Sequence, residues 1–499
     1  MILVLLLIIP LIAGPLAFFL RRRPTMEVVN LAAFSVELGL AVALAAQVLR
    51  SGPASLWDGF LYADTLSALV VLLSAFVSLV CSIYAVGYFR HEDRSGVLQE
   101  AKEVGGRFAV DKLREYYALM PLLVFAMMLV ALANNLGILW VAVEGTTLAS
   151  VFLVMFYGRE TSLEAAWKYA IIGGVGLSMA LFGTILTYYS AYGALGTDTL
   201  AGLNWSVLAG NAAQFDKPTM RLAFILILLG YGTKAGIAPM HTWKPEAYSE
   251  APIPGAAMLA TGVLNCALYA LVRFYILSAK CLGPHFGSRL LILFGLLTMA
   301  VAVPFILVQK NFRRLLAYSS IDHSGIMVLA LGFGGPLGIL GMLLHMTFHS
   351  VTKPLLFFCA GNVQQHLNTD LFRNAKSGLI HSMPLTGAAF LMVTLAVTGS
   401  PPFSFFQSEF TILRAAFSGG YFVLAVFFVS FLVLIFAGFL VHIANLVLGE
   451  DPGLPRTDIC RWKKYSVAGL AVVIVVMGFW IPAPLFRLIQ GAVGIVVGG

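Results

Sequence analysis

Residues 228–243, LLGYGTKAGIAPMHTW, place a lysine inside an apolar stretch long enough to cross a lipid bilayer. An ionisable group near the bilayer centre is costly and therefore rare, and it usually marks a functional position. Pro239 follows Lys234 by five residues, and Gly232 and Gly236 flank the lysine. Because proline removes a backbone donor, this pattern predicts a membrane helix that is interrupted beside a buried charge.

The overall composition also indicates a membrane protein. Of the 499 residues, 60% are hydrophobic and 11% are charged. Soluble domains carry about 25% charged residues, so this composition excludes a soluble cytosolic enzyme. The net charge of +8 does not indicate a nucleic-acid partner, because the basic residues lie in short loops between apolar runs. We expect the lipid bilayer as the surroundings and no nucleic acid as a partner.

Apolar windows predict an all-α polytopic fold with fourteen membrane spans. The expected spans are 1–20, 27–49, 62–89, 116–134, 136–157, 164–190, 220–242, 253–279, 288–308, 316–333, 337–361, 383–415, 421–448 and 464–489. The first lacks the basic region of a signal peptide, so we expect it to be a retained helix. An even number of spans places both termini on one side of the membrane.

The basic residues predict which side that is. The loops after odd-numbered spans hold twenty Lys and Arg residues, whereas the opposite loops hold five. This bias predicts a protein of the inner (cytoplasmic) membrane with both termini on the non-cytoplasmic side. Residues 90–115 are expected to form a cytoplasmic surface segment, and residues 191–219 a small polar loop on the other side.

Further ionisable residues fall within the expected spans. Glu144 lies in the fifth span and Lys168 opens the sixth, while Glu409 lies in the twelfth, shortly after Pro401 and Pro402. The twelfth span is therefore a second interrupted helix with a charge, five spans after the seventh. Such pairs are typical of inverted-repeat transporters, and the odd offset reverses the direction of the second repeat.

These features predict two inverted five-helix repeats with broken helices 7 and 12. Residues 1–115 would hold helices 1–3 and the cytoplasmic loop, and residues 116–279 the first repeat, helices 4–8. Residues 288–448 would hold the second repeat, helices 9–13, and residues 449–499 the last helix.

The eleventh span, within GMLLHMTFHSVTKPLLFF (341–358), carries three ionisable groups at helical spacing. His345, His349 and Lys353 fall on one helix face over about 12 Å, at about 1.5 Å per residue. Imidazole exchanges protons near neutral pH, so the stripe suits proton transfer. Zinc binding is not expected, because a third ligand and the HExxH glutamate are absent.

Structural alternatives stay open for these residues. A structural ion pair is the alternative for Glu144 and Lys234, and satisfied core groups are the alternative for the histidines. Snorkelling to the membrane interface is the alternative for Lys168. Arg273 is expected to anchor the end of the eighth span.

The cysteines and glycines predict no cofactor in this chain. The five cysteines form no CxxC pair, and the chain has neither a GxGxxG motif nor a P-loop. We therefore expect no disulfide framework, zinc site, iron–sulfur cluster, flavin or nucleotide. The cysteines are Cys81, Cys266, Cys281, Cys359 and Cys460.

Several motifs resemble the antiporter-like subunits of respiratory complex I, of membrane-bound group 4 nickel–iron hydrogenases and of multisubunit cation/proton antiporters. They are GTKAGIAPMHTWKPEAYSEAPIP (232–254), AYSSIDHSGIM (317–327), HMTFHSVTKPLLFF (345–358) and SPPFSFFQSEF (400–410). The runs 144–172 and 263–275 look closest to the hydrogenase-4 component F branch. The resemblance covers about residues 60–445 and implies fourteen helices with two inverted repeats.

The resemblance also implies roles for individual residues. The helix-5 glutamate and helix-7 lysine of the family fall on Glu144 and Lys234, an ion pair thought to open and close during pumping. The exit-side residue of helix 12 falls on Glu409. The polar residues of helix 11 fall on His345, His349 and Lys353, with His323 and His241 as weaker candidates.

Two departures from the resembled family stand out. Complex I relatives often carry a lysine in helix 8, and here that position is Asn265, which holds water but takes no proton at neutral pH. The relay from Lys234 to Glu409 would then run through water and the span-11 stripe, or be incomplete. We also expect no lateral helix like that of the most distal complex I subunit.

The resemblance implies a proton-translocating subunit of a redox-driven complex of hydrogenase or NADH/quinone oxidoreductase type. Its partners would be other membrane subunits and a peripheral electron-transfer arm with iron–sulfur clusters. The alternatives are a sodium/proton antiporter subunit without a redox partner, a non-pumping membrane anchor, and a subunit that energises inorganic-carbon uptake. Any oxidoreductase activity would belong to the complex, because this sequence shows no redox centre.

Overall fold

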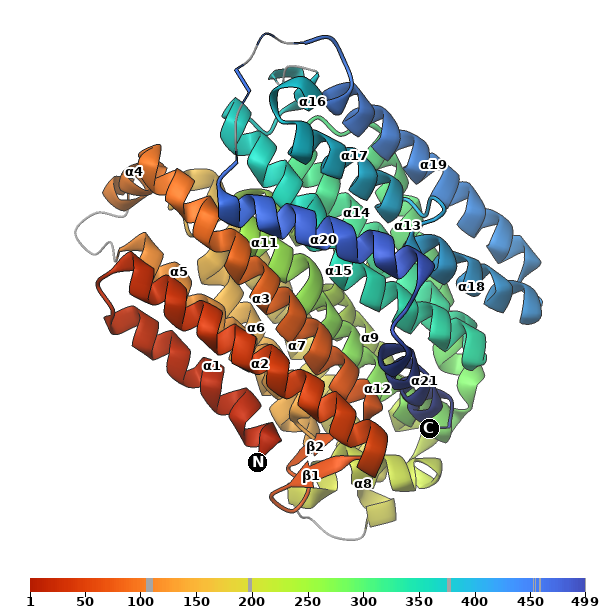
Figure 1. Ribbon diagram of the computed structural model, residues 1–499. Coiled ribbons are helices and arrows are strands. Elements are labelled where there is room, and N and C mark those ends of the chain that lie inside the picture. Colours follow the sequence, from red (N-terminus) through yellow and green to blue (C-terminus); the bar gives the residue numbers. More distant parts are fainter. Residues whose placement is uncertain are drawn as a thin grey trace.

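The computed structural model describes residues 1–104, 111–195, 200–374, 378–451, 453, 455, 456 and 459–498. Long helices packed side by side make up most of this part of the chain (Figure 1). The first half contains α1 (Ile2–Phe19), α2 (Arg23–Ser51), α3 (Thr65–Arg94), α4 (Val97–Val104), α5 (Lys112–Leu132), α6 (Leu136–Val154), α7 (Glu160–Leu195), α8 (Trp205–Asn211), α9 (Lys217–Ala235), α10 (Trp243–Glu250) and α11 (Ile253–Met258). The second half contains α12 (Leu264–Leu282), α13 (Pro284–Leu307), α14 (Phe312–Phe333), α15 (Gly335–Leu367), α16 (Leu379–Ser382), α17 (Pro384–Val397), α18 (Ser404–Ser418), α19 (Phe422–Val447), α20 (Arg461–Phe479) and α21 (Ala483–Val497).

The described helices account for the expected membrane crossings. Eleven of them are long and apolar enough to span a bilayer, with α11 and α12 joined through the π-helical turn Leu259–Val263. The other three crossings are α9 with α10, α15, and α17 with α18. The polytopic all-α fold is therefore confirmed.

Side-chain caps determine where several of these helices begin. Asp64 accepts a hydrogen bond from the Ser67 amide at 2.9 Å at the start of α3. Asn135, Asp216 and Asn311 cap α6, α9 and α14 in the same way. Each cap satisfies an amide group that the first helical turn leaves without a partner.

The helices differ in how far they are buried. The best spanning windows of α14 and of α11–α12 are wholly buried, whereas only 28% of the α19 window is buried. The α19 sequence is apolar on every side, as a lipid-facing helix requires. Helices α12 and α14 are thus central, and α19 lies at the periphery.

The seventh and twelfth crossings are broken, as expected. Helix α9 ends at Ala235 and is followed by Gly236, whose φ of 72° is left-handed, and α10 starts at Trp243. Helix α17 ends before Gly399, which also has a φ of 72°, and α18 starts at Ser404. Glycine carries no Cβ penalty at positive φ, so it permits both breaks.

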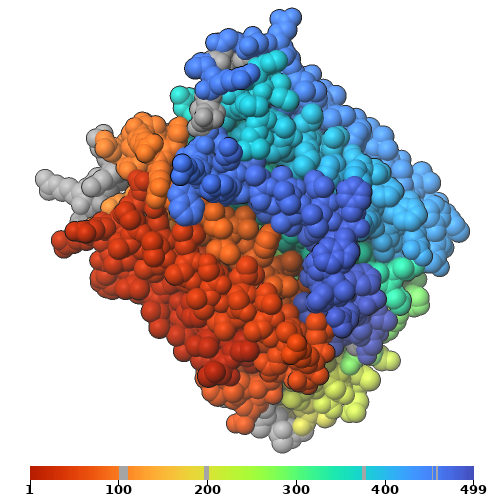
Figure 2. All heavy atoms as spheres, in the orientation of Figure 1, coloured from red at the N-terminus to blue at the C-terminus, as the bar shows by residue number. Residues whose placement is uncertain are grey.

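The last span was predicted wrongly as one helix over 464–489. The structure instead has α20 and α21, separated at Trp480–Pro482. Pro482 and Pro484 account for the separation, because proline cannot donate the backbone bond that would continue α20. The two helices lie beside the N-terminal helices on the face that Figure 2 shows.

A small hairpin was not predicted. Strands β1 (Ala54–Leu56) and β2 (Leu61–Ala63) pair antiparallel. The hairpin and α8 lie at the end of the bundle where both termini also lie, and α4 and α16 lie at the opposite end (Figure 1). Parts of the two expected loops, residues 105–110 and 196–199, lie outside the described residues. The division into four parts remains a prediction.

Candidate proton-transfer site

Lys234 lies beside Glu144 in the fold without pairing with it. Its side chain is 2% exposed in the last turn of α9. The ammonium donates hydrogen bonds to Thr147 Oγ1 at 2.8 Å and to the Tyr169 hydroxyl at 2.6 Å. Thr147 follows Glu144 by three residues on α6, and the buried Oε2 of Glu144 accepts no hydrogen bond from the described residues. The candidate ion pair is therefore open.

Close packing holds Lys234 in this position. The Tyr169 ring stacks on Trp243 with centroids 4.3 Å apart, and Trp243 Nε1 donates to the Thr233 carbonyl at 2.9 Å. Helix α7 approaches α9 at Gly176, where a Cβ would lie 2.5 Å from Thr233 Cβ. These contacts hold Tyr169 on α7 in a fixed position against α9, the helix that carries Lys234.

Lys244 is a second buried lysine that sequence reasoning missed. We counted it among the twenty cytoplasmic loop charges, but in α10 it is 0% exposed. Its ammonium donates to the Ala235 carbonyl at the end of α9, at 2.5 Å, and to Ser324 Oγ at 3.1 Å. A cation at a helix C-terminus is favourable, which explains how the helix break accommodates this charge. Its position in the motif after Pro239 was the available signal.

Two more of the twenty basic residues expected in cytoplasmic loops are also buried. Arg313 donates to the Tyr248 carbonyl at 2.9 Å and to the Ala251 carbonyl, and it is 3% exposed. Lys463, 4% exposed, donates to Gln365 Oε1. These side chains fasten the ends of helices, so not every basic residue near a span end faces water.

Helix α14 places an unpredicted carboxyl group next to the span-11 stripe. The Lys353 ammonium donates to Ser319 Oγ on α14 at 2.6 Å. Asp322 lies three residues further along α14, is 1% exposed and leaves Oδ1 without a hydrogen-bond partner in the described chain. Its carboxylate acts electrostatically on Lys353. Asp322 lies within the quoted motif AYSSIDHSGIM, where His323 drew attention instead.

Three histidines meet where α14, α15 and α18 converge. His323 Nδ1 lies 2.8 Å from His345 Nε2, and His345 Nδ1 lies 3.0 Å from Ser408 Oγ. The rings of His323 and His349 have centroids 5.3 Å apart, and neither ring nitrogen of His349 has a partner in the described chain. His323, expected to be a weaker candidate, therefore bridges directly to the stripe.

Glu409 is the residue after Ser408 in α18, where the series of contacts ends at Ser408. It is 7% exposed. Its Oε2 would lie 1.9 Å from a Cβ added at residue 399. Gly399 therefore makes room for the carboxyl group. Glu409 also lines a largely apolar cavity of about 390 Å³ beside Phe410 and Phe428, between α18 and α19.

Asn265 is joined to the stripe although it cannot take a proton. It is 0% exposed, and its Nδ2 donates to Ser350 Oγ at 2.8 Å, next to His349 in the sequence. Its Oδ1 has no partner in the described chain. A buried amide oxygen without a partner is a position that a bridging water would satisfy.

The remaining two candidates lie apart from this series. Lys168 is 44% exposed in its side chain and pairs with Glu164 at 2.7 Å and Glu246 at 2.9 Å. His241 is 7% exposed between α9 and α10, with Nδ1 unpartnered in the described chain. Lys168 thus lies at the surface, whereas His241 borders the helix break.

The ionisable groups inside the bundle, all buried except the half-buried Glu144, extend across it through α14, which contacts Lys244, Lys353 and His345. We call this set the polar row. The polar row consists of Glu144, Lys234, Lys244, Asp322, Lys353, His349, His323, His345 and Glu409.

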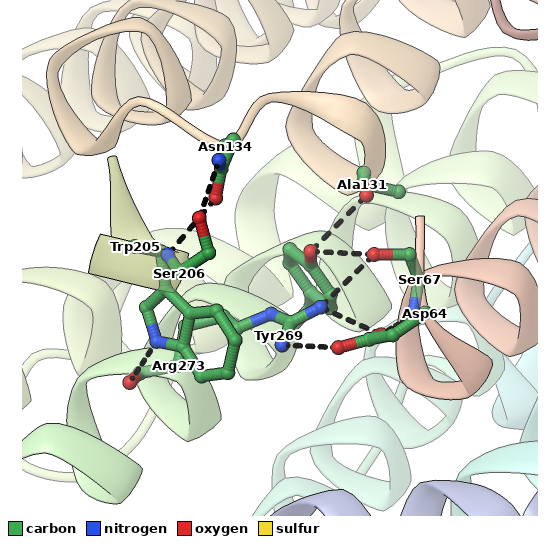
Figure 3. Close-up of polar contacts among 8 residues, drawn as sticks. All are labelled: Asp64, Ser67, Ala131, Asn134, Trp205, Ser206, Tyr269 and Arg273. Atoms are coloured by element: carbon green, nitrogen blue, oxygen red, sulfur yellow. Dashed lines mark hydrogen bonds and ion pairs between the residues drawn. The ribbon is translucent and has the colours of Figure 1, made fainter. Parts of the chain in front are cut away.

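A separate buried ion pair closes the end of the bundle that carries the hairpin (Figure 3). The Arg273 guanidinium donates to both carboxylate oxygens of Asp64, at 2.7 and 2.8 Å, and Trp205 covers it at 4.1 Å from the ring centroid. Burial alone would raise the pKa of Asp64, but the Arg273 charge and hydrogen bonds hold it below its usual range. Arg273 was expected to anchor the end of its span, but it lies near the middle of α12 and ties that helix to the start of α3.

Comparisons with known proteins identify related membrane proteins. Residues 133–435 match the family model described as NADH:quinone oxidoreductase/Mrp antiporter, transmembrane. The chain is 39% identical over 361 residues to the hydrogenase-4 component F homolog of Methylacidiphilum infernorum, covering 72% of this chain and 73% of that protein. It is 31% identical over 447 residues to NADH-quinone oxidoreductase subunit N of Desulforudis audaxviator, covering 86% and 83%.

A solved structure extends the similarity over nearly the whole chain. A chain of the membrane-bound sulfane sulfur reductase, an archaeal respiratory membrane complex, superposes with a TM-score of 0.85 and 25% identity. The match covers 99% of this chain and 97% of that one.

Proposed function

This chain belongs to the NADH:quinone oxidoreductase/Mrp antiporter transmembrane family, and we propose that it moves protons along its polar row when a redox partner drives it. It is an antiporter-like membrane subunit of a complex I-like or hydrogenase-type assembly, and other membrane subunits are its partners. The observation that best supports proton movement is the buried Lys234 ammonium. Among the described residues it donates hydrogen bonds only to two neutral hydroxyls, beside the unpartnered Glu144 oxygen.

In the proposed cycle, the Glu144–Lys234 ion pair closes and opens. When Glu144 and Lys234 close to about 4 Å, their attraction is about 4 kcal/mol at an effective dielectric constant of about 20. Moving one charge across 100 mV costs about 2.3 kcal/mol. Closing and opening can therefore supply enough energy to hold and then release one proton against a membrane potential.

The released proton then passes to α14 and its neighbours. Lys244 and Lys353 both donate to serines of α14, so their exchangeable protons face the same helix. The bridges from His323 through His345 reach Ser408, the residue before Glu409 in α18. We propose that water joins the remaining steps, including the Asn265 position, where an amide oxygen without a partner can hold it.

The same proposal extends to the surroundings of the chain. It places the protein in the inner membrane with both termini outside the cytoplasm, following the excess of basic residues in the alternate loops. It gives the electron-transfer chemistry to a peripheral arm with iron–sulfur clusters and assigns no cofactor to this chain. The redox arm perturbs the Glu144–Lys234 pair through the neighbouring membrane subunits.

The test uses membrane vesicles that contain the intact complex, energised by its electron donor. Lys234→Gln should lower proton uptake at least tenfold and leave the amount of assembled complex unchanged. Lys310→Gln changes an exposed lysine and serves as the matched control. Normal proton uptake in Lys234→Gln would contradict the proposal. Sodium movement without any electron donor would instead support the antiporter alternative.

A further inference from the structure

A basic cavity lies at the opposite end of the bundle from the Asp64–Arg273 pair. Its volume is about 350 Å³, and it lies between the last turns of α3 and α15 and the first turn of α20. Neither Asp nor Glu lines it in the described part of the chain. Its ionisable lining residues are Arg90, His91, Arg94, His366, Arg461 and Lys463.

The charge of this cavity is only partly balanced. Arg90 donates to Glu27 at 2.7 Å, so its charge is neutralised locally. Lys463 is buried and bonds to the neutral Gln365 side chain, which in turn donates to Glu92 at 2.7 Å. Arg94 and Arg461 are exposed and make no ion pair among the described residues. The cavity therefore presents at least two unpaired guanidinium groups.

Trp462 places the cavity at the level of lipid headgroups, and the start of α20 offers amide groups to an anion. Trp462 lies at its rim, with the Arg90 guanidinium 5.8 Å from the ring centroid, and tryptophan is enriched at the membrane–water interface. Helix α20 starts at Arg461 without a side-chain cap, so its first amide groups are free to face an anion. Helices α3 and α20 pack closely here, since a Cβ added at Gly87 would lie 2.8 Å from Lys463 Cγ.

We propose that this cavity binds a phosphate-bearing anion. The two chemical sources are the headgroup of an anionic phospholipid and free phosphate from the aqueous phase. Guanidinium groups recognise phosphate through paired hydrogen bonds, which fits Arg94 and Arg461 at the rim. The bound anion would tie α20 to α3 and α15 and would make attachment of the C-terminal helices depend on the lipid composition.

The test measures binding to the purified full chain in nanodiscs. One arm adds phosphatidylglycerol to a phosphatidylcholine background, and the other adds inorganic phosphate to phosphatidylcholine discs. Bound lipid is counted by native mass spectrometry, and the melting temperature is followed in both arms. We expect phosphatidylglycerol, and not phosphatidylcholine, to be retained and to raise the melting temperature. A rise with inorganic phosphate alone would identify free phosphate as the source.

Paired variants separate this site from diffuse surface charge. Arg94→Gln with Arg461→Gln should weaken binding about 30-fold, since each juxtamembrane basic residue contributes about 1 kcal/mol. Arg94→Lys with Arg461→Lys should retain most of the binding. Arg21→Gln with Arg22→Gln removes two exposed arginines from another loop and should have no effect. Unchanged binding in the first variant, or equal loss in the Arg21/Arg22 control, would overturn the proposal.

Discussion

Arg273 and Asp64 lie 209 positions apart in the chain, yet they share two parallel hydrogen bonds at 2.7 and 2.8 Å inside the protein. The pair joins the start of α3 to the middle of α12. Because both side chains are at most 2% exposed, loss of one leaves the other buried without a counter-charge.

Asp64→Asn should therefore destabilise the protein by about 3–5 kcal/mol. The expected result is a lower melting temperature in detergent, with Arg273 left unpaired. Arg221→Gln, a change on the exposed surface of α9, is the control. If both variants melted like the wild type, the pair would not contribute to stability.

The same carboxyl group predicts a pH dependence. The pKa of Asp64 is lowered in the folded state, so its contribution is complete above the unfolded value of about 3.9 and is lost as pH falls through the folded value. The difference in stability between wild type and Asp64→Asn should be constant above about pH 5 and shrink in stronger acid. Melting curves of both proteins across pH check this, and a difference that grew in acid would contradict it.

Gly399→Ala should disturb Glu409 specifically. The new Cβ would lie 1.9 Å from Glu409 Oε2, so the carboxyl group must move away from residue 399. We expect at least a tenfold loss of proton uptake in vesicles. Gly420→Ala is the matched control, because residue 420 has a similar φ of 76° but nothing within 4 Å of the added Cβ. Equal losses in both would show that backbone strain, not Glu409, is responsible.

Lys244→Met should reduce proton uptake about as strongly as a change at Lys234. Its ammonium is one of two that donate to α14 serines, so its removal breaks the polar row between α10 and α14. Lys168→Gln, which alters a surface ion pair, should leave uptake unchanged. Normal uptake in Lys244→Met would exclude Lys244 from the path.

Much of the fold could be predicted from the sequence, because membrane spans depend on local composition. Gly236 with Pro239, and Gly399 with Pro401, located both broken helices correctly. The prediction failed at residues 480–484, where an average over apolar residues hid Pro482 and Pro484. The hairpin at 54–63 was also missed, since such short strands leave little periodicity.

The candidate site was harder to predict, because it depends on contacts between distant segments. Helical spacing placed His345, His349 and Lys353 on one helix, but it could not show that α14 packs against them. Asp322 and Lys244 were missed for this reason. Asp322 lies in a serine-rich stretch of the sequence, and Lys244 lies in a segment that was expected to be a loop. Only the packing of α10 and α15 against α14 brings them together.

The cavity beside Glu409 opens on the flank of the bundle, among the exposed side chains of Phe410 and Val433. A proton that reached this carboxyl group would meet whatever stands against α18 and α19, either lipid tails or an adjoining protein. Hydrocarbon would block its departure, whereas a polar neighbour would give it an outlet. The neighbour at that flank would then decide whether this chain discharges protons alone or hands them sideways.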